Sequence, residues 1–189
     1  MKFQDISAFN LAMLTKQAWR LIHSTHSLFY RVYKAWYFPN CSFMMAKLGS
    51  NPSYVWRSLL ATREVIRKGS TWQVGDGRMI GVTSHKWLPN TPVFLREPEV
   101  ELKVYDLINQ TTGQWDRGKL FATFTPRTCA EIIATPLNHL DSQDLLVWTE
   151  NKDRIFSVKT AYQVALRLKS SGMAEHSSAR VHSATWGKI

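Results

Sequence analysis

The sequence predicts a mostly helical α+β protein: a basic N-terminal helical unit, then two β-hairpins with short helices, then a flexible C-terminal tail. Apolar residues recur at helical spacing through residues 1–70. Strand-forming runs flank short polar turns after residue 71. The last twenty residues are rich in Ser and His and poor in large apolar side chains. We therefore expect a basic helical unit over 1–70, an α+β region over 71–169 and a flexible linker over 170–189.

Three helices are expected in the basic unit, over 7–23, 28–38 and 52–68. Ser27 is a suitable N-cap for the second helix, because its hydroxyl can accept a backbone N–H of the first turn. Gly69 follows the third helix at the position that ends many helices. The apolar stripe of the second helix comprises Leu28, Val32, Ala35 and Trp36.

The apolar period changes from helix to strand after residue 70. A β-hairpin is expected over 71–83 around the turn Gly75-Asp76-Gly77, and a second over 145–158 around residues 151–153. Residues 89–100 contain three prolines and are expected to form a surface loop. Three further helices are expected, near 100–109, 126–134 and 158–169.

The charge is strongly positive and unevenly distributed. The 189 residues include 24 Lys+Arg and 14 Asp+Glu, a formal net charge of +10. Residues 1–70 contain ten basic and two acidic side chains, a net charge of +8, and the other 119 residues have a net charge of +2. Clustered Lys and Arg are typical of proteins that bind phosphate backbones.

Composition excludes several classes of protein. No run approaches the roughly 18 consecutive apolar residues of a membrane span, so we expect no membrane partner. Polar residues interrupt the N-terminal stretch, which argues against a secretory signal. Cys41 and Cys129 are the only cysteines, too few for a disulfide framework and too isolated for a zinc site. An intracellular location is expected, the nucleus being one candidate.

The motifs that could support catalysis have simpler structural interpretations. The run 75–77 lacks the spacing of a phosphate-binding loop and is better read as a tight turn. Asp141 and Asp144 could be a metal-binding pair, but turn chemistry is the favoured interpretation. His23 and His26 could bind a metal weakly, although helix-end polar residues are the default. We predict no catalytic residue, no metal ligand and no cofactor.

Basic side chains at helical spacing are the stronger signal. Pairs such as Lys16 and Arg20 lie one turn apart, which gathers charge on one surface. A solvated helix face is the competing interpretation, and Arg63 within an apolar stripe favours a side chain that extends along apolar surface. The candidate nucleic-acid-binding residues are Lys16, Arg20, Arg31, Lys34, Arg57, Arg63, Arg67 and Lys68.

Several segments in order resemble a plant-type non-LTR (LINE) retrotransposon reverse-transcriptase polyprotein, in the region downstream of its polymerase core. The segments are DISAFNLAMLTKQAWRL at 5–21, RVYKAWYFP at 31–39, PSYVWRSLL at 52–60 followed by Arg63, WQVGDG at 72–77 with WLP at 87–89, and FSVKTAY at 156–162. Together they extend over residues 5–162.

This resemblance implies a place between the polymerase core and a zinc-binding and RNase H region. In such a polyprotein the segment acts as thumb and connection, so the implied partners are an RNA/DNA template–primer and the remaining polymerase domains. The Tyr-x-Asp-Asp motif of the polymerase is absent here. The resemblance therefore predicts a non-catalytic fragment of an RNA-directed DNA polymerase.

Three departures from the family pattern indicate a decayed copy. Thr83 and His85 stand where the family usually has Trp and Asp, and Arg154 stands where a turn Gly is usual. The main alternative function is accordingly a structural or interaction module, or the product of a decayed copy without independent activity. An independent enzyme ranks last, because the sequence offers no catalytic constellation.

Overall fold

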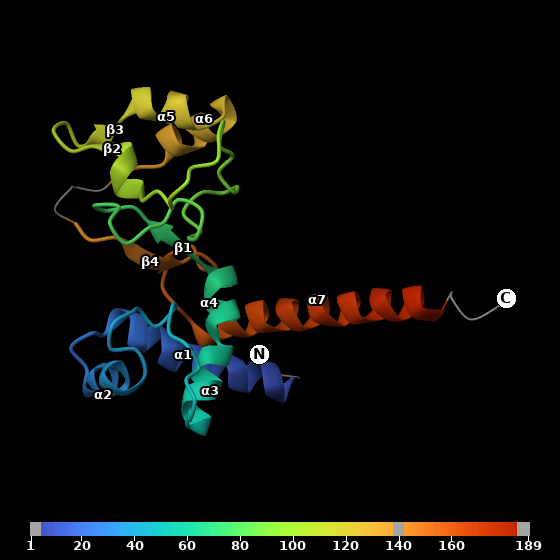
Figure 1. Ribbon diagram of the computed structural model, residues 1–189. Helices are drawn as coiled ribbons and strands as arrows, with labels where there is room; N and C mark the ends of the chain where they lie inside the picture. The colour runs from blue at the N-terminus through green and yellow to red at the C-terminus, as the bar shows by residue number, and fades with distance from the viewer. Residues whose placement is uncertain (1–4, 138–141, 185–189) are drawn as a thin grey trace. The chain divides into compact units, whose positions relative to one another are not determined.

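The computed structural model describes residues 5–137 and 142–184, and it describes side chains as far as residue 171. Contacts divide the chain into two compact units (Figure 1). The helical unit combines the four N-terminal helices with the long C-terminal helix, and the α+β unit spans Ser70–Thr149. The predicted class, a mostly helical α+β protein, is confirmed.

Five helices build the helical unit: α1 (Ile6–His23), α2 (Leu28–Tyr37), α3 (Tyr54–Ala61), α4 (Arg63–Gly69) and α7 (Val158–Ala184). Side-chain oxygens cap the first three, since Asp5, Ser27 and Ser53 each accept a backbone N–H three residues ahead. The helices expected over 7–23 and 28–38 are confirmed within two residues. The third is divided at Thr62, whose hydroxyl donates to the Leu59 carbonyl at 2.7 Å.

Helix α7 runs antiparallel to α1 and covers its small-residue face. The buried face of α1 consists of Ala8, Ala12, Thr15, Ala18 and Leu21. Small side chains at this spacing let a second helix approach closely, and α7 contributes the buried Ala161 and Ala165.

Two polar contacts and one aromatic contact fix the direction of α7. Lys169 pairs with Asp5 at 2.5 Å, and the Tyr162 hydroxyl accepts the Asp5 N–H at 3.2 Å. At the other end of α1, Trp19 stacks on Phe156 with ring centroids 5.3 Å apart. Residues 158–169, expected to belong to the α+β region, instead contact α1 and α4 of the helical unit.

The α+β unit has two small antiparallel sheets. β1 (Ser70–Gln73) pairs with β4 (Leu145–Trp148), and β2 (Ile108–Asn109) pairs with β3 (Gln114–Trp115). A 3₁₀ turn, η1 (Val104–Leu107), precedes β2. The sheets and α5 (Arg117–Thr123) and α6 (Pro126–Ala134) enclose a single core that includes Val74, Ile80, Trp87, Leu107, Phe124 and Ile132.

The hairpin predicted over 71–83 is wrong, because β1 pairs with a strand about 75 residues further along the chain. The register aligns Gln73 with Leu145. The adjacent Asp144 carboxylate accepts the N–H groups of Gly75, Gly77 and Met79 at 2.8–2.9 Å. This carboxylate holds residue 144 beside the Gly75 turn, so the following residues lie along β1 rather than along 79–83.

The second predicted hairpin is also wrong, since residues 155–158 form no strand with β4. They lead through a turn at residues 151–154 into α7, where the Ser157 hydroxyl accepts the Thr160 N–H at 3.3 Å. Helix α7 continues to Ala184, beyond the end expected near Lys169. No proline interrupts residues 170–184 and they include several Ala, which permits helix where a linker was expected. Residues 185–189 lie outside the described part.

Candidate nucleic-acid interface

An aromatic cluster underlies the second helix of the helical unit. Trp56 is fully buried, and Tyr37 and Phe38 stack on it with centroids 4.6 and 5.8 Å away. Tyr33 and Phe43 contact the same indole at 6.2 and 5.9 Å. Helix α2 therefore packs through its tyrosine face, and burial raises the pKa of Tyr33.

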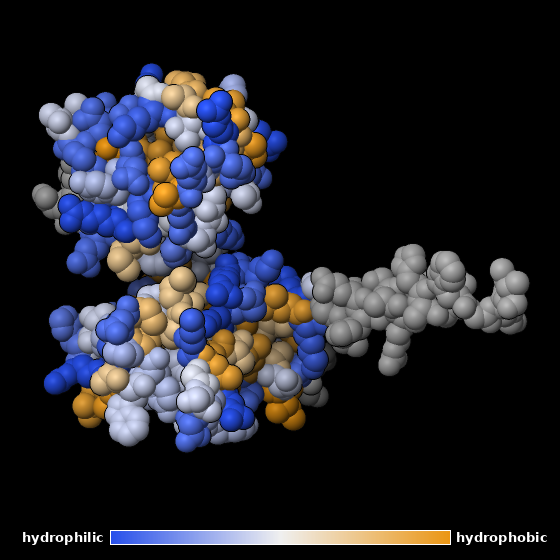
Figure 2. Space-filling view, viewed as in Figure 1, coloured by the Kyte–Doolittle hydropathy of each residue, from blue (hydrophilic) through white to orange (hydrophobic). Residues whose placement is uncertain are grey.

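This packing leaves the predicted apolar stripe of α2 on the surface. Leu28 is 73% exposed, Val32 47% and Trp36 79%. Figure 2 shows apolar side chains at the surface over α2. Periodicity alone did not reveal which face is buried, because the apolar stripe and the tyrosine face are both candidates for packing against the rest of the unit. The tyrosines prevail by stacking on Trp56, a partner distant in sequence.

Two of the eight candidate basic residues hold the fold together. The Arg63 guanidinium lies over the Phe43 ring at 5.2 Å and donates to the carbonyls of Phe43 and Ala46, the latter at 2.6 Å. Burial, with Arg67 nearby, lowers its pKa. Lys34 Nζ donates to the Cys41 carbonyl at 2.7 Å. Both cationic side chains thus donate to backbone carbonyls of this protein, and those donors are not available to a ligand.

The other candidates lie on exposed helix faces. Arg67 pairs with Glu64, and Arg20 donates to the Gln17 amide oxygen at 3.3 Å. Among the described residues, no salt bridge joins the following exposed side chains to an acidic group: Lys16, Arg20, Arg31, Arg57 and Lys68. They come from α1, α2, α3 and α4, so every N-terminal helix presents an uncompensated positive charge.

The two units differ sharply in charge. Residues 70–149 contain seven basic and nine acidic side chains, a net charge of −2. The rest of the sequence contains seventeen basic and five acidic side chains, a net charge of +12. Residues 6–63 contain no Asp or Glu but seven Lys or Arg, Arg63 included. The excess positive charge therefore belongs to the helical unit, to which α7 and its flanking residues add.

The Gly75-Asp76-Gly77 run is a turn closed by a carboxylate. Its N–H groups point at Asp144, as described above, which occupies the position an anionic ligand would take. A Cβ at Gly75 would overlap the Ser142 carbonyl, and one at Gly77 would overlap the backbone of Tyr105. The run is a bend held by Asp144, and the tight hairpin turn predicted here is wrong because β1 pairs with β4.

The candidate metal ligands that the structure describes make contacts within the fold. Asp144 is engaged by three backbone N–H groups, and Asp141 lies outside the described residues. His23 Nδ1 lies 3.0 Å from the Trp19 carbonyl and its ring stacks on the Trp19 indole. Within the described ranges, no three His, Cys, Asp or Glu side chains form a group that could hold a metal ion.

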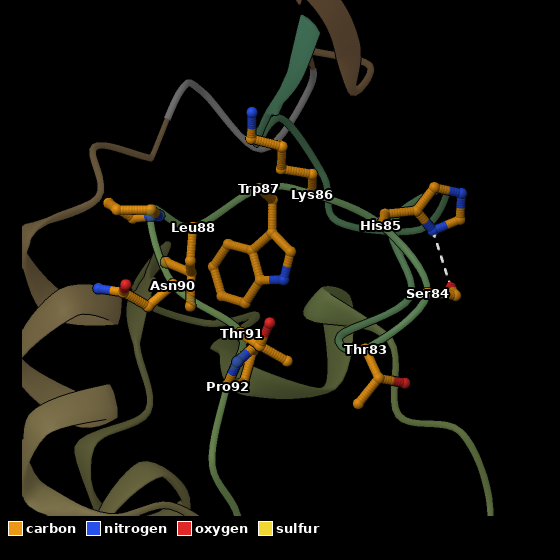
Figure 3. A pocket seen from close by; sticks show the side chains of 10 residues that line it. Thr83, Ser84, His85, Lys86, Trp87, Leu88, Asn90, Thr91 and Pro92 are labelled. Atoms are coloured by element: carbon orange, nitrogen blue, oxygen red, sulfur yellow. Dashed lines mark hydrogen bonds between the residues drawn. The ribbon is translucent and has the colours of Figure 1, made fainter. Parts of the chain in front are cut away.

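A shallow hollow of about 400 Å³ in the α+β unit is lined by residues 83–92 (Figure 3). Its Trp87 indole is buried and donates to the Val82 carbonyl at 3.0 Å. His85 Nδ1 accepts the Gly81 N–H at 2.9 Å and lies 3.0 Å from the Ser84 hydroxyl. Burial, aided by Lys103, lowers the pKa of His85. Nδ1 is thus a structural acceptor, the role a carboxylate can also fill.

Comparison with known proteins finds two relatives from Arabidopsis thaliana. A protein named "Uncharacterized mitochondrial protein" is 40% identical over 86 residues, which are 46% of this chain and 56% of that protein. A "Putative ribonuclease H protein" is 26% identical over 168 residues, which are 83% of this chain and 27% of that protein. No protein-family model matches the chain. No solved structure matches it either.

The chain spans about half the length of the first relative and about a quarter of the second. In the described part of the chain, none of the helices has the length and hydropathy needed to cross a membrane. The relatives are consistent with a plant retrotransposon-derived protein, as the motifs between residues 5 and 162 also indicate.

Proposed function

We propose that this chain is a non-catalytic thumb and connection segment of a retrotransposon reverse transcriptase, and that its helical unit grips the backbone of a template–primer. The observation that supports this most strongly is the net charge of +12 outside the α+β unit. Contacts of this kind position a duplex without reading its sequence. Lys16, Arg20, Arg31, Arg57 and Lys68 make these contacts, while Lys34 and Arg63 support the fold beneath them.

The lack of acidic partners matters because a carboxylate in a salt bridge already neutralises the Lys or Arg and occupies the donors that would bind phosphate. Only Arg67 of the eight candidates pairs with a carboxylate among the described residues. Each phosphate contact releases condensed counterions, so the affinity must fall steeply with salt. Five such contacts predict a loss on the order of several hundredfold between 50 and 200 mM salt.

The test is a fluorescence-anisotropy titration of a labelled, primed RNA template with the full chain at several salt concentrations. Replacing the five exposed residues by Gln should lower the slope of log affinity against log salt by about 4–5. A matched control replaces five exposed basic residues of the α+β unit, which should leave the slope unchanged: Lys86, Arg96, Arg117, Lys119 and Arg127. The proposal fails if the wild-type chain does not bind at low salt, or if both variants lose affinity equally.

An interaction module is the second candidate function. The exposed Leu28 and Val32 on α2 favour it, since apolar stripes on a helix face commonly cover a partner protein. The remaining polymerase domains are the partner that the resemblance implies. Binding of those domains by the full chain, without any salt-dependent binding of nucleic acid, would favour this candidate.

A further inference from the structure

We infer that a hollow beside Trp36 binds an unpaired base of a single-stranded nucleic acid; this inference rests on the proposed function and adds a site to it. The hollow has a volume of about 470 Å³ and lies where α2 ends and the segment before α3 returns. Trp36 and Tyr37 form one wall, and residues 47–53 form the other. We call it the Trp36 hollow.

The aromatic wall suits a nucleobase. Trp36 is 79% exposed, so its large π-face is open to solvent on at least one side. An aromatic face can stack on any base, which gives affinity without sequence preference. Tyr37 cannot take this role in the same way, because its ring stacks on the buried Trp56 at 4.6 Å and an interplanar angle of 13°.

The opposite wall supplies charge and polar groups. Lys47 is exposed and forms no salt bridge with the described acidic residues. Because no Asp or Glu occurs between Ile6 and Arg63, nothing nearby in sequence offsets its charge. Lys47 can therefore pair with the phosphate that flanks a stacked base, while the exposed Ser50 and Asn51 present polar side chains to the base edge.

The hollow is held in shape from beneath. Arg63 donates to the carbonyls of Phe43 and Ala46, which fixes the segment that leads to Lys47. The Tyr37 hydroxyl donates to the Ser53 hydroxyl at 2.8 Å, which joins the two walls. Ser53 in turn caps α3 by accepting the Trp56 N–H at 3.2 Å. A preformed site loses less conformational freedom when it binds.

A protein helix is the competing occupant, since Trp36 shares a face of α2 with Leu28 and Val32. Two features favour nucleic acid. First, Leu28 and Val32 do not line the hollow. Second, the wall opposite Trp36 contains Lys47 and polar side chains, and Leu48 is its one large aliphatic residue. A surface that has a basic residue, no acidic residue and an exposed aromatic ring suits a base stacked on the ring and a phosphate bound beside it.

The experiment measures binding of the full chain to a fluorescein-labelled oligo(U) of fifteen nucleotides and to a blunt-ended duplex of the same length. Trp36→Ala should weaken oligo(U) binding by about tenfold, the usual effect of losing one stacking partner. It should change duplex binding less than about twofold, while Trp36→Phe retains most of the oligo(U) affinity. The matched control is Tyr54→Ala, which removes an aromatic that is 85% exposed on α3 but outside the hollow.

The outcomes separate the two proposals. If the wild-type chain binds neither oligo(U) nor duplex at low salt, the proposed function fails and this site fails with it. If it binds both, yet Trp36→Ala and Tyr54→Ala match wild type, only the Trp36 hollow is refuted. If Trp36→Ala leaves oligo(U) binding intact but abolishes binding to purified polymerase domains, a protein covers this face and the inference is also refuted.

Discussion

Arg63 and Lys34 illustrate how a basic side chain at helical spacing can serve the fold instead of a ligand. Lys34 shares α2 with the exposed Arg31, and Arg63 shares α4 with the exposed Lys68. Their donors are directed at backbone carbonyls 7 to 20 residues away in sequence. Position on a helical wheel separates these roles poorly, because the deciding acceptors come from the loop after α2.

Two residues that depart from the retroelement sequence pattern that this chain resembles have different structural consequences. At His85, Nδ1 accepts a backbone N–H, so a neutral imidazole meets the need of the turn. Arg154 instead adopts φ of 57°, and it is the only non-glycine residue at positive φ in the described ranges. Residue 154 thus has the left-handed conformation that glycine adopts most readily, in a residue poorly suited to it.

Arg154→Gly should stabilise the helical unit by about 1 kcal/mol, since glycine adopts positive φ without a Cβ penalty. Urea unfolding monitored by circular dichroism would measure the change. Lys152→Gly is the control, because it changes a neighbouring turn residue whose φ is not positive and should not stabilise. Unchanged or lowered stability in Arg154→Gly would show that the left-handed conformation costs nothing here.

At the scale of elements, local sequence predicts the N-terminal helices better than the strands. The helix expected near 100–109 is a 3₁₀ turn followed by β2, and α5 was not expected. The caps at Asp5, Ser27 and Ser53 act within three residues, so a short window contains the relevant partners. β1 and β4 are separated by about 70 residues, and no periodicity links them. Their pairing depends on the Asp144 carboxylate, for which the sequence favours a role in a turn and leaves metal binding as the alternative.

Asp144→Ala should destabilise the α+β unit by about 3 kcal/mol, because three backbone N–H groups lose a charged acceptor. Thermal unfolding by near-ultraviolet circular dichroism would detect the loss through the tryptophans of this unit. Asp153→Ala provides the comparison, since that carboxylate accepts only the Ile155 N–H, at 3.2 Å, among the bonds described. Equal effects of the two substitutions would mean that Asp144 does not hold β4 beside β1.

At the scale of the whole molecule, the excess positive charge lies in the helical unit, whereas both sheets lie in the α+β unit. The main core cluster of the α+β unit lies between Val74 and Ile132, and Leu146, Val147 and Trp148 of β4 are also buried. β1 and β4 bring the two ends of this segment side by side, with Ser70 opposite Trp148. Such a segment can fold without the rest of the chain.

Residues 70–149 expressed alone should therefore unfold cooperatively and bind the primed template at least about a hundredfold more weakly than the full chain, in line with a net charge of −2. Thermal denaturation and the anisotropy titration described above measure the two properties. Leu107→Asp in the same segment supplies an unfolded reference. Template binding by the isolated segment as tight as that of the full chain would contradict the assignment of the interface to the helical unit.

The sequence by itself determined the mostly helical class, the Ser27 cap, the basic character of the N-terminal third and the likeness to plant retroelement proteins, since each depends on composition or on neighbours within a few residues. The tertiary structure decided which face of α2 is buried, which basic residues have free donors, that β1 pairs with β4, and that α7 completes the helical unit. Those outcomes depend on Trp56, Phe43, Asp144 and the small-residue face of α1 meeting partners that are distant in sequence.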